Sequence, residues 1–156
     1  MGSFDEIDLR LLEALQTDAS RSTQDIASSI GLSHNACWRR VKRLEGEGLI
    51  RARVALLDEK LLGVGVTVFV GFRTNQHSDD WLERFASGVK RIPEVVELYR
   101  MSGDVDYLAK VLVRDIGEYD LVYRRLIQVA ELHDVSSSFA MERIKHTTAI
   151  PLPDAE

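Results

Sequence analysis

The chain has 156 residues, 45% of them hydrophobic, which is enough for one medium-sized domain or two small ones. A single cysteine excludes an intramolecular disulfide, and no apolar run approaches the ~20 residues that span a bilayer. The net charge is −5, yet residues 33–53 hold six Lys/Arg against two acidic residues, so this window is +4 and the remainder −9. A basic patch on an acidic body is typical of a protein that contacts DNA at one place.

The first predicted element is a helix over residues 5–15. Its apolar face consists of Ile7, Leu11, Leu12 and Leu15. The acidic residues of its first turn, Asp5, Glu6 and Asp8, complement the positive N-terminal end of the helix dipole. The N-terminal residues lack the basic and apolar regions of a secretory signal, so we expect a cytoplasmic protein.

Residues 22–50 predict two short helices joined by a tight turn. Ser22 is a suitable N-cap, because its hydroxyl can accept a hydrogen bond from a free amide of the first turn. Gly31 ends the first of these helices, as glycine does where the chain enters the left-handed region, and Ser33 caps the second. The buried stripe of the second helix consists of Cys37, Val41 and Leu44. The pattern is a helix-turn-helix, whose second helix presents its polar face to the DNA major groove.

The exposed side of this second helix supplies the predicted DNA contacts. Its N-terminal end points into the groove, where Asn35 suits adenine and Arg39 suits guanine. The other cations position the helix on phosphates. The predicted DNA-binding residues are Ser33, His34, Asn35, Trp38, Arg39, Arg40, Lys42, Arg43 and Arg51.

Three alternatives stay open for this helix. A cationic amphipathic helix is often only a solvated face, although here it is combined with a buried stripe and a Gly-Leu-Ser turn. Trp38 contacts a sugar or a thymine methyl, or else packs under a wing. Cys37 is a buried apolar filler or a redox group, and a buried thiol without a neighbouring base is inert.

Residues 49–57 are rich in apolar residues and partly alternating, which predicts a strand with a wing-like turn before it. Residues 58–65 hold two glycines and no strong core pattern, so we place the domain boundary there. The predicted organisation is a winged helix-turn-helix domain over residues 4–57, a hinge over 58–65 and a second domain over 66–150.

The second domain predicts strands alternating with two helices. The strands are expected at 66–72, 95–101, 107–113 and 135–144, with a short fifth strand up to Ile150. Ser78 and Asp115 cap the helices, whose stripes are Leu82, Phe85, Val89 and Ile92, and Tyr119, Val122, Leu126 and Val129. The order β-α-β-β-α-β predicts an α+β, ferredoxin-like sandwich with both helices on one face of an antiparallel sheet.

That plan leaves the other face of the sheet uncovered. The residues expected there are too apolar to stay in water, namely Thr67, Phe69, Leu108, Leu112 and Phe139. Pairing with a second sheet would cover them, so we expect a homodimer built through this domain.

The turn at residues 102–106 offers the groups that a free amino acid needs. Gly103 lets backbone amides approach an α-carboxylate closely, while Asp104 and Asp106 provide anions for an α-ammonium. The predicted effector-binding residues are Met101, Gly103, Asp104, Asp106, Ser136, Ser137 and Ser138, with Arg100 flanking the loop. The alternative is an ordinary hairpin turn, which Ser-Gly-Asp forms readily, and the residues alone favour that alternative.

No set of residues predicts catalysis or metal binding. The four histidines are scattered, and one cysteine leaves no zinc-binding spacing. The chain contains neither a glycine-rich phosphate loop nor a nucleophile elbow. We therefore expect no enzyme, no cofactor and no metal.

Three stretches resemble the Lrp/AsnC family of leucine-responsive and asparagine-operon regulators. They are GLSHNACWRRVKRLEGEGLI at 31–50, SGDVDYLAKV at 102–111 and SSSFAMERIK at 136–145, and the resemblance covers about residues 4–150. Within the family, VALLD, HSDDW, RMSGDVDYL and SSFAMERIKHTTAIP resemble the branch that controls cysteine detoxification.

The resemblance implies a bacterial, nucleoid-associated regulator with a winged helix-turn-helix, a hinge strand and an effector-binding αβ sandwich. It implies dimers that assemble further, often to octamers, and that bind free amino acids between dimers. It favours the effector pocket over the hairpin alternative. Cysteine is the first effector to test.

Three functions follow from these observations. The leading hypothesis is a sequence-specific transcription regulator that binds double-stranded DNA and responds to a small free amino acid. The second is an architectural DNA-wrapping protein without a ligand response. The third is an enzyme on the ferredoxin-like domain, a fold with many functions, which the missing catalytic set disfavours.

Overall fold

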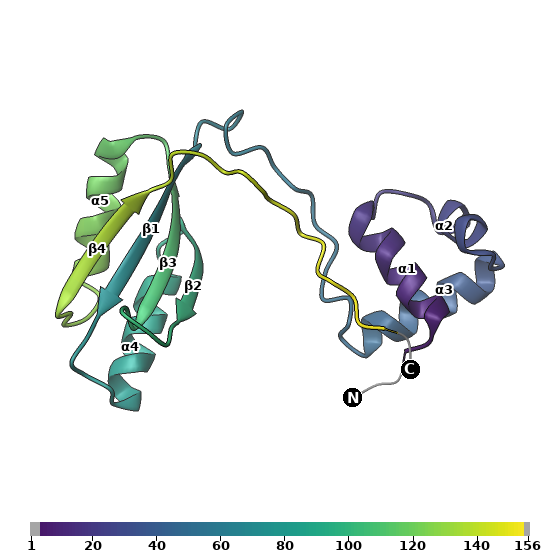
Figure 1. The fold of residues 1–156 in the computed structure, drawn as a ribbon, viewed down its shortest axis with the longest axis horizontal. Helices are drawn as coiled ribbons and strands as arrows, with labels where there is room; N and C mark the ends of the chain where they lie inside the picture. Colours follow the sequence, from purple (N-terminus) through teal and green to yellow (C-terminus); the bar gives the residue numbers. More distant parts are fainter. Residues whose placement is uncertain (1–3, 155–156) are drawn as a thin grey trace. The chain divides into compact units, whose positions relative to one another are not determined.

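The computed structural model describes residues 4–154, which form two compact units (Figure 1). The first unit contains the described residues up to Leu56 together with those from Ile144 onward. The second unit runs from Leu57 to Arg143. Within the described residues, none of the helices has the length and apolar character needed to cross a membrane.

The helices of the first unit are α1 (Glu6–Thr17), α2 (Thr23–Ile30) and α3 (His34–Gly46). The predicted caps are confirmed: the hydroxyl of Ser22 accepts a hydrogen bond from the Asp25 amide at 3.1 Å, and that of Ser33 from the Ala36 amide at 3.3 Å. Gly31 ends α2 with a φ of 76°, in the left-handed region that favours glycine. The helix-turn-helix is therefore present as the sequence predicted.

The core of the first unit is built from one face of each helix. The predicted stripe of α3 is confirmed, since Cys37, Val41 and Leu44 are all buried. They pack with Leu11 of α1 and Ala27 of α2, which are both fully buried. Burial of these apolar side chains is the main force that holds the three helices together.

A buried carboxylate also joins α1 to α3. The side chain of Asp8 is only 2% exposed, and Arg40 Nη1 donates to its Oδ1 at 2.8 Å while Arg43 Nη2 donates to its Oδ2. Asp5, the N-cap of α1, forms a capping box with Asp8 and also accepts from Arg40 at 2.8 Å. Burial by itself raises the pKa of Asp8, but the hydrogen bonds from Arg43 and Arg40 outweigh it and hold that pKa below its ordinary value.

Two features predicted for this part of the chain are wrong. Residues 49–57 form no strand, and residues 51–57 are exposed, so the helix-turn-helix has no wing strand. A strand needs a neighbour for its backbone hydrogen bonds, and the first unit forms no other strand in its described residues. The predicted fifth strand before Pro151 is also absent, because residues 140–154 contain no strand.

The C-terminal segment contacts the end of α1 through one side chain. Gln16 Nε2 donates to the carbonyl oxygen of Ile150 at 3.1 Å, and the Ile150 amide donates to Gln16 Oε1 at 3.0 Å. The side-chain amide thus pairs with one backbone residue through both of its polar atoms. The contact lies within the first unit, which includes the described residues from Ile144 onward, whereas the sequence suggested that residues up to 150 continue the second domain.

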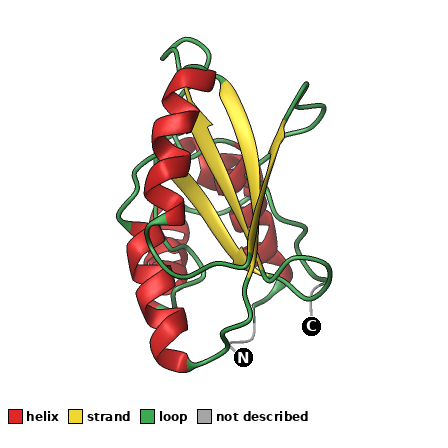
Figure 2. Ribbon diagram, turned by 90° about the vertical axis from the view of Figure 1, so that its left-hand side faces the viewer, coloured by secondary structure: helices red, strands yellow, loops and turns green. Residues whose placement is uncertain are grey.

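The second unit has the predicted β-α-β-β-α-β order. Its elements are β1 (Val66–Arg73), α4 (Asp79–Lys90), β2 (Val95–Arg100), β3 (Tyr107–Val113), α5 (Ile116–Ile127) and β4 (Asp134–Phe139). The four strands form one antiparallel sheet in the order β2-β3-β1-β4 (Figure 1), with the marked twist seen in Figure 2. The ferredoxin-like plan is confirmed, although β4 ends at Phe139 instead of residue 144.

Both helices pack on one face of this sheet. Val68, Val70 and Phe72 of β1 are fully buried against them. Trp81 and Phe85 of α4 stack with ring centroids 5.0 Å apart. The stripe predicted for α4 began at Leu82 and so missed Trp81, which is almost fully buried and whose indole N–H donates to the Glu131 carbonyl at 3.1 Å.

The other face of the sheet is open in the single chain. Phe69 points to it and is 38% exposed, as the sequence predicted. The placement predicted for Phe139 is wrong, because Phe139 pairs with Val68 and therefore points to the helix-covered face. There its ring meets Tyr119 of α5 edge-on, at a centroid distance of 5.2 Å.

Replacing Asp8 with Asn should destabilise the first unit, because Arg40 and Arg43 would lose the carboxylate between them. Breaking a buried ion pair costs about 3–5 kcal/mol, and both arginines keep part of their surface in water, so we expect about 2 kcal/mol. The lowered folded-state pKa sets the pH dependence. The contribution is complete above the ordinary carboxyl pKa and is lost as the pH falls through the lowered folded-state pKa.

Urea unfolding followed by far-ultraviolet circular dichroism, at neutral and at acid pH, measures this effect. The stabilities of the wild type and Asp8→Asn should converge in acid. Glu6→Gln removes the same charge from an exposed position in the same helical turn and should change stability by less than ~0.5 kcal/mol. Equal stability of Asp8→Asn and Glu6→Gln at neutral pH would contradict the role of Asp8.

Candidate DNA-binding helix and effector loop

The N-terminal half of α3 presents polar side chains to solvent. His34, Asn35 and Arg39 are exposed, and Trp38 keeps 51% of its surface exposed. The Arg39 guanidinium has no hydrogen-bond or ion-pair partner among the described residues. Ser33, which the sequence predicted to contact DNA, uses its hydroxyl as the N-cap of α3. This part of α3 can therefore offer both hydrogen-bonding groups and an apolar surface to a groove.

The other cations predicted to contact DNA, in α3 and just after it, fall into two groups. Arg40 and Arg43, for which the sequence predicts phosphate contacts, are ion-paired with Asp8 and hold α3 against α1. Lys42 contacts Glu45 at 2.8 Å on the surface, where such a pair contributes little and can be exchanged for a phosphate. Arg51 is exposed and has no partner among the described residues.

The structure decides between the alternatives that the sequence left open for Trp38 and Cys37 of α3. Packing of Trp38 under a wing is not observed, because residues 49–57, where the wing strand was predicted, form no strand. Cys37 is fully buried, and burial raises the pKa of its thiol. A thiol that stays protonated is a poor nucleophile, so Cys37 acts as part of the core.

The predicted effector loop folds back onto the end of β1. The Asp106 amide donates to the Phe72 carbonyl at 2.9 Å, and the Met101 amide donates to the Asp106 carbonyl at 2.8 Å. One carboxylate oxygen of Asp106 accepts from the Thr74 amide at 2.8 Å, so this side chain fastens the loop to the chain after β1. Gly103 has a φ of 145°, which only glycine adopts readily.

A glycine in β1 makes room for this loop. A Cβ atom on Gly71 would lie 2.9 Å from Ser136 Oγ and 3.0 Å from Val105 Cγ1, both too close. Any side chain at this position would therefore push the loop or β4 away from the sheet. The sequence pattern does not reveal this role of Gly71, because the contact joins residues far apart in the chain.

The three serines of β4 do not act as one group. Ser136 pairs with Gly71 and Ser138 with Phe69, so both point to the open face. Ser137 pairs with Val70 and points to the helices, where its hydroxyl hydrogen-bonds the phenol of Tyr119. The prediction that all three contribute hydroxyls to one effector pocket is therefore wrong for Ser137, because neighbouring residues of a strand point to opposite faces.

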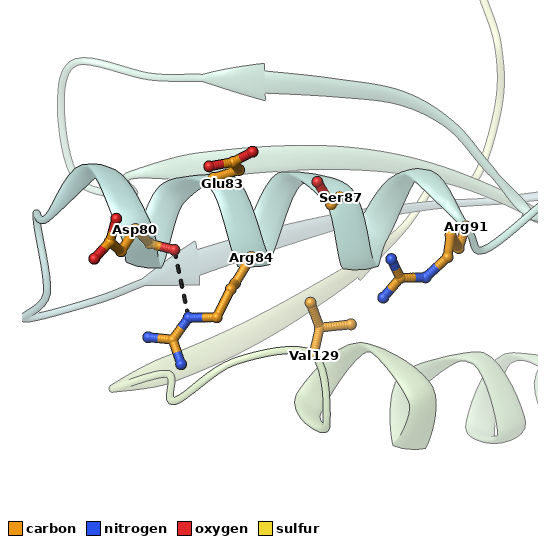
Figure 3. A pocket seen from close by; sticks show the side chains of 6 residues that line it. All are labelled: Asp80, Glu83, Arg84, Ser87, Arg91 and Val129. Atoms are coloured by element: carbon orange, nitrogen blue, oxygen red, sulfur yellow. Dashed lines mark hydrogen bonds between the residues drawn. The ribbon is translucent and has the colours of Figure 1, made fainter.

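A hollow of about 830 Å³ lies elsewhere in the second unit (Figure 3). It lies along α4 and is lined by Asp80, Glu83, Arg84, Ser87, Arg91 and Val129. Arg84 Nε donates to the Asp80 carbonyl at 3.4 Å, so part of this lining is engaged within the helix. The sequence predicted no site here. The lining of the hollow mixes two acidic side chains, Asp80 and Glu83, with two basic ones, Arg84 and Arg91. Among the described residues, no group of His, Cys, Asp and Glu side chains is arranged to hold a metal ion.

Two family models match this chain. The AsnC-type helix-turn-helix domain matches residues 4–45, and the Lrp/AsnC ligand binding domain matches residues 67–150. A glutamate uptake regulatory protein from Zymomonas mobilis is 47% identical over 151 residues, which cover 97% of this chain and 92% of that protein. The DNA-binding transcriptional activator DecR from Escherichia coli is 46% identical over 150 residues, which cover 96% and 99%.

Solved structures agree with this match. The crystal structure of an AsnC family transcriptional regulator from Agrobacterium tumefaciens is 52% identical, with a TM-score of 0.92 and coverage of 95% of this chain and 97% of that one. A transcriptional regulator from Neisseria meningitidis in complex with L-Met is 30% identical, with a TM-score of 0.90 and coverage of 96% and 97%.

These relatives carry different regulatory names, so they establish the family without selecting the cysteine-detoxification branch. They are named as regulators and not as enzymes, which confirms the expectation from the missing catalytic set. The chain belongs to the Lrp/AsnC family, as a transcriptional regulator that joins an AsnC-type helix-turn-helix to an amino-acid-binding domain.

Proposed function

We propose that the chain is a sequence-specific DNA-binding regulator whose assembly or DNA affinity responds to a small free amino acid. The observation that carries the proposal is the exposed N-terminal half of α3, where Arg39 has no partner among the described residues. Asn35 suits a bidentate contact with adenine and Arg39 one with guanine, while Lys42 and Arg51 suit phosphates. The first unit is then the DNA-binding part, and the protein acts on the nucleoid in the cytoplasm.

The effector part of the proposal rests on the loop of residues 101–106. Its glycine, its carboxylates and the nearby hydroxyl of Ser136 suit the charged groups of a free amino acid. The L-Met complex of the Neisseria meningitidis regulator supports this class of ligand. Cysteine is the first amino acid to test, because of the resemblance to the cysteine-detoxification branch.

Self-association is the third part of the proposal. The open face of the sheet is lined by Phe69, Leu108 and Leu112, and Phe69 is 38% exposed in the single chain. A second copy would cover this face, and further assembly, up to an octamer, would present several α3 helices to one DNA. An effector that binds one assembly state better than another would shift their populations.

Replacing Arg39 with Ala should weaken binding to a preferred DNA site by about 1–3 kcal/mol and relax the base preference at one position. The preferred site is first selected from random duplexes, and affinity is then measured by fluorescence anisotropy at several salt concentrations. Arg10→Ala removes the same charge from an exposed position of α1 and should leave base preference unchanged. An unchanged preference in Arg39→Ala would count against the base contact.

The melting temperature of the full chain should rise with at least one free amino acid, because a ligand that binds only the folded state stabilises it. The stabilisation is about 2.7 kcal/mol when the ligand is at 100 times its dissociation constant. The screen covers each proteinogenic amino acid at millimolar concentration under reducing conditions, beginning with cysteine. If none of them shifted the melting temperature, the architectural DNA-wrapping alternative would replace the sensor.

Replacing Phe69 with Lys should weaken self-association by at least about tenfold, because a charge placed in an apolar interface must lose its hydration. Sedimentation velocity over a range of protein concentrations measures the change. Ile116→Lys places the same charge on the exposed start of α5 and should leave self-association as it is. A Phe69→Lys protein that associates like the wild type would exclude the open face as the interface.

A further inference from the structure

Arg73 ends β1 beside the effector loop and is absent from the residues that the sequence predicted for effector binding. Its Nε donates to the carbonyl oxygen of Asp104 at 2.6 Å, and its side chain is 50% exposed. A guanidinium has five N–H donors, so this bond leaves its outer nitrogens available. Its other contact with a charged group among the described residues is long, 3.9 Å from Nη1 to Asp134 Oδ2 at the surface.

The register of the sheet places Arg73 at the same corner as the loop. Residues two apart in a strand point to the same face, so Arg73 shares the open face with Gly71. Val105 of the loop lies directly over Gly71, and Ser136 lies beside it. A cation, a hydroxyl and the loop backbone therefore meet around the end of β1.

The two carboxylates of the loop differ in how they are engaged. Asp106 accepts the Thr74 amide and fastens the loop. The carboxylate of Asp104 has no hydrogen-bond or ion-pair partner among the described residues, although its backbone carbonyl holds Arg73. Asp104 thus has two separate roles: its backbone carbonyl orients the Arg73 guanidinium, and its carboxylate remains unpaired among the described residues.

We propose that Arg73 recognises the α-carboxylate of the amino acid and that the side chain of Asp104 recognises its α-ammonium. The inference rests on the proposed amino-acid response and assigns one side chain of this protein to each charged group of the ligand. Arginine suits this role because its planar guanidinium can donate two parallel hydrogen bonds to a carboxylate. The bond to the Asp104 carbonyl holds the guanidinium in place, so less side-chain freedom is lost when the ligand binds.

The neighbouring Arg100 offers a matched control. It pairs with Tyr107, whose ring is buried on the helix-covered face, so Arg100 points away from the open face. Arg73→Gln and Arg100→Gln therefore remove the same charge from opposite sides of the sheet. Arg73→Lys keeps the charge and removes the planar donor pair.

Isothermal titration calorimetry of the full chain with L-cysteine and L-methionine, and with the α-amide of each, tests the inference. The wild type should bind the amino acid at least about tenfold more tightly than its amide, because only the acid offers a carboxylate. Arg73→Gln should lose at least about tenfold in affinity for the acid and bind acid and amide alike. The ratio of acid to amide affinity of Arg73→Lys should fall between those of the wild type and Arg73→Gln. The ratio of Arg100→Gln should match that of the wild type.

The ratio of acid to amide affinity separates recognition from a purely structural role. If Arg73 only fastened the loop, its loss would weaken both ligands equally and leave the ratio unchanged, which would overturn the inference. Retained discrimination in a folded Arg73→Gln protein would overturn it as well, while the proposed function would stand. The same titrations include any other amino acid that raises the melting temperature in the screen. A wild type that bound none of the proteinogenic amino acids would instead overturn the amino-acid response itself, and the assignment of Arg73 with it. Melting temperatures of the variants confirm that each one is folded.

Discussion

The position of α3, the helix proposed to face DNA, depends on the buried carboxylate of Asp8. This single anion accepts from Arg40 and Arg43, which lie on successive turns of α3, and it belongs to the first turn of α1. The charge-assisted hydrogen bonds and the apolar core beneath them hold α3 at a defined rotation about its axis. That rotation decides which residues of α3 face solvent, so the same contact that stabilises the unit also selects the surface proposed for DNA.

The same contact changes the electrostatic description of the helix. Residues 33–53 carry a formal charge of +4. In the structure, however, Asp5 and Asp8, which lie outside this window, form ion pairs with Arg40 inside it. The cations free for DNA are therefore fewer than the count suggests. We expect a small number of phosphate contacts and hence a modest non-specific affinity, with specificity carried by the few side chains at the start of α3.

In the second unit, the corresponding constraint is the absence of a side chain at Gly71. It lets Val105 and the loop lie against the open face of the sheet, beside Ser136 and Arg73. The proposed effector site thus borders the apolar face that we propose for self-association. A ligand at this corner can favour one assembly over another without a large change within the chain, since it needs only a difference in affinity between the two states.

Local signals in the sequence determined the helices and the order of the strands. Ser22, Ser33 and Gly31 act through neighbours in the chain, and the apolar periods reveal which faces α2 and α3 bury. What only the tertiary structure decided are contacts between distant residues: the capture of Arg40 by Asp8, the turning of Ser137 and Phe139 toward the helices, and the missing wing. A one-residue change of register reverses the direction of every side chain in a strand, and an ion pair between helices has no fixed spacing in the sequence. Such contacts are therefore set by the packing of the elements and not by their local pattern.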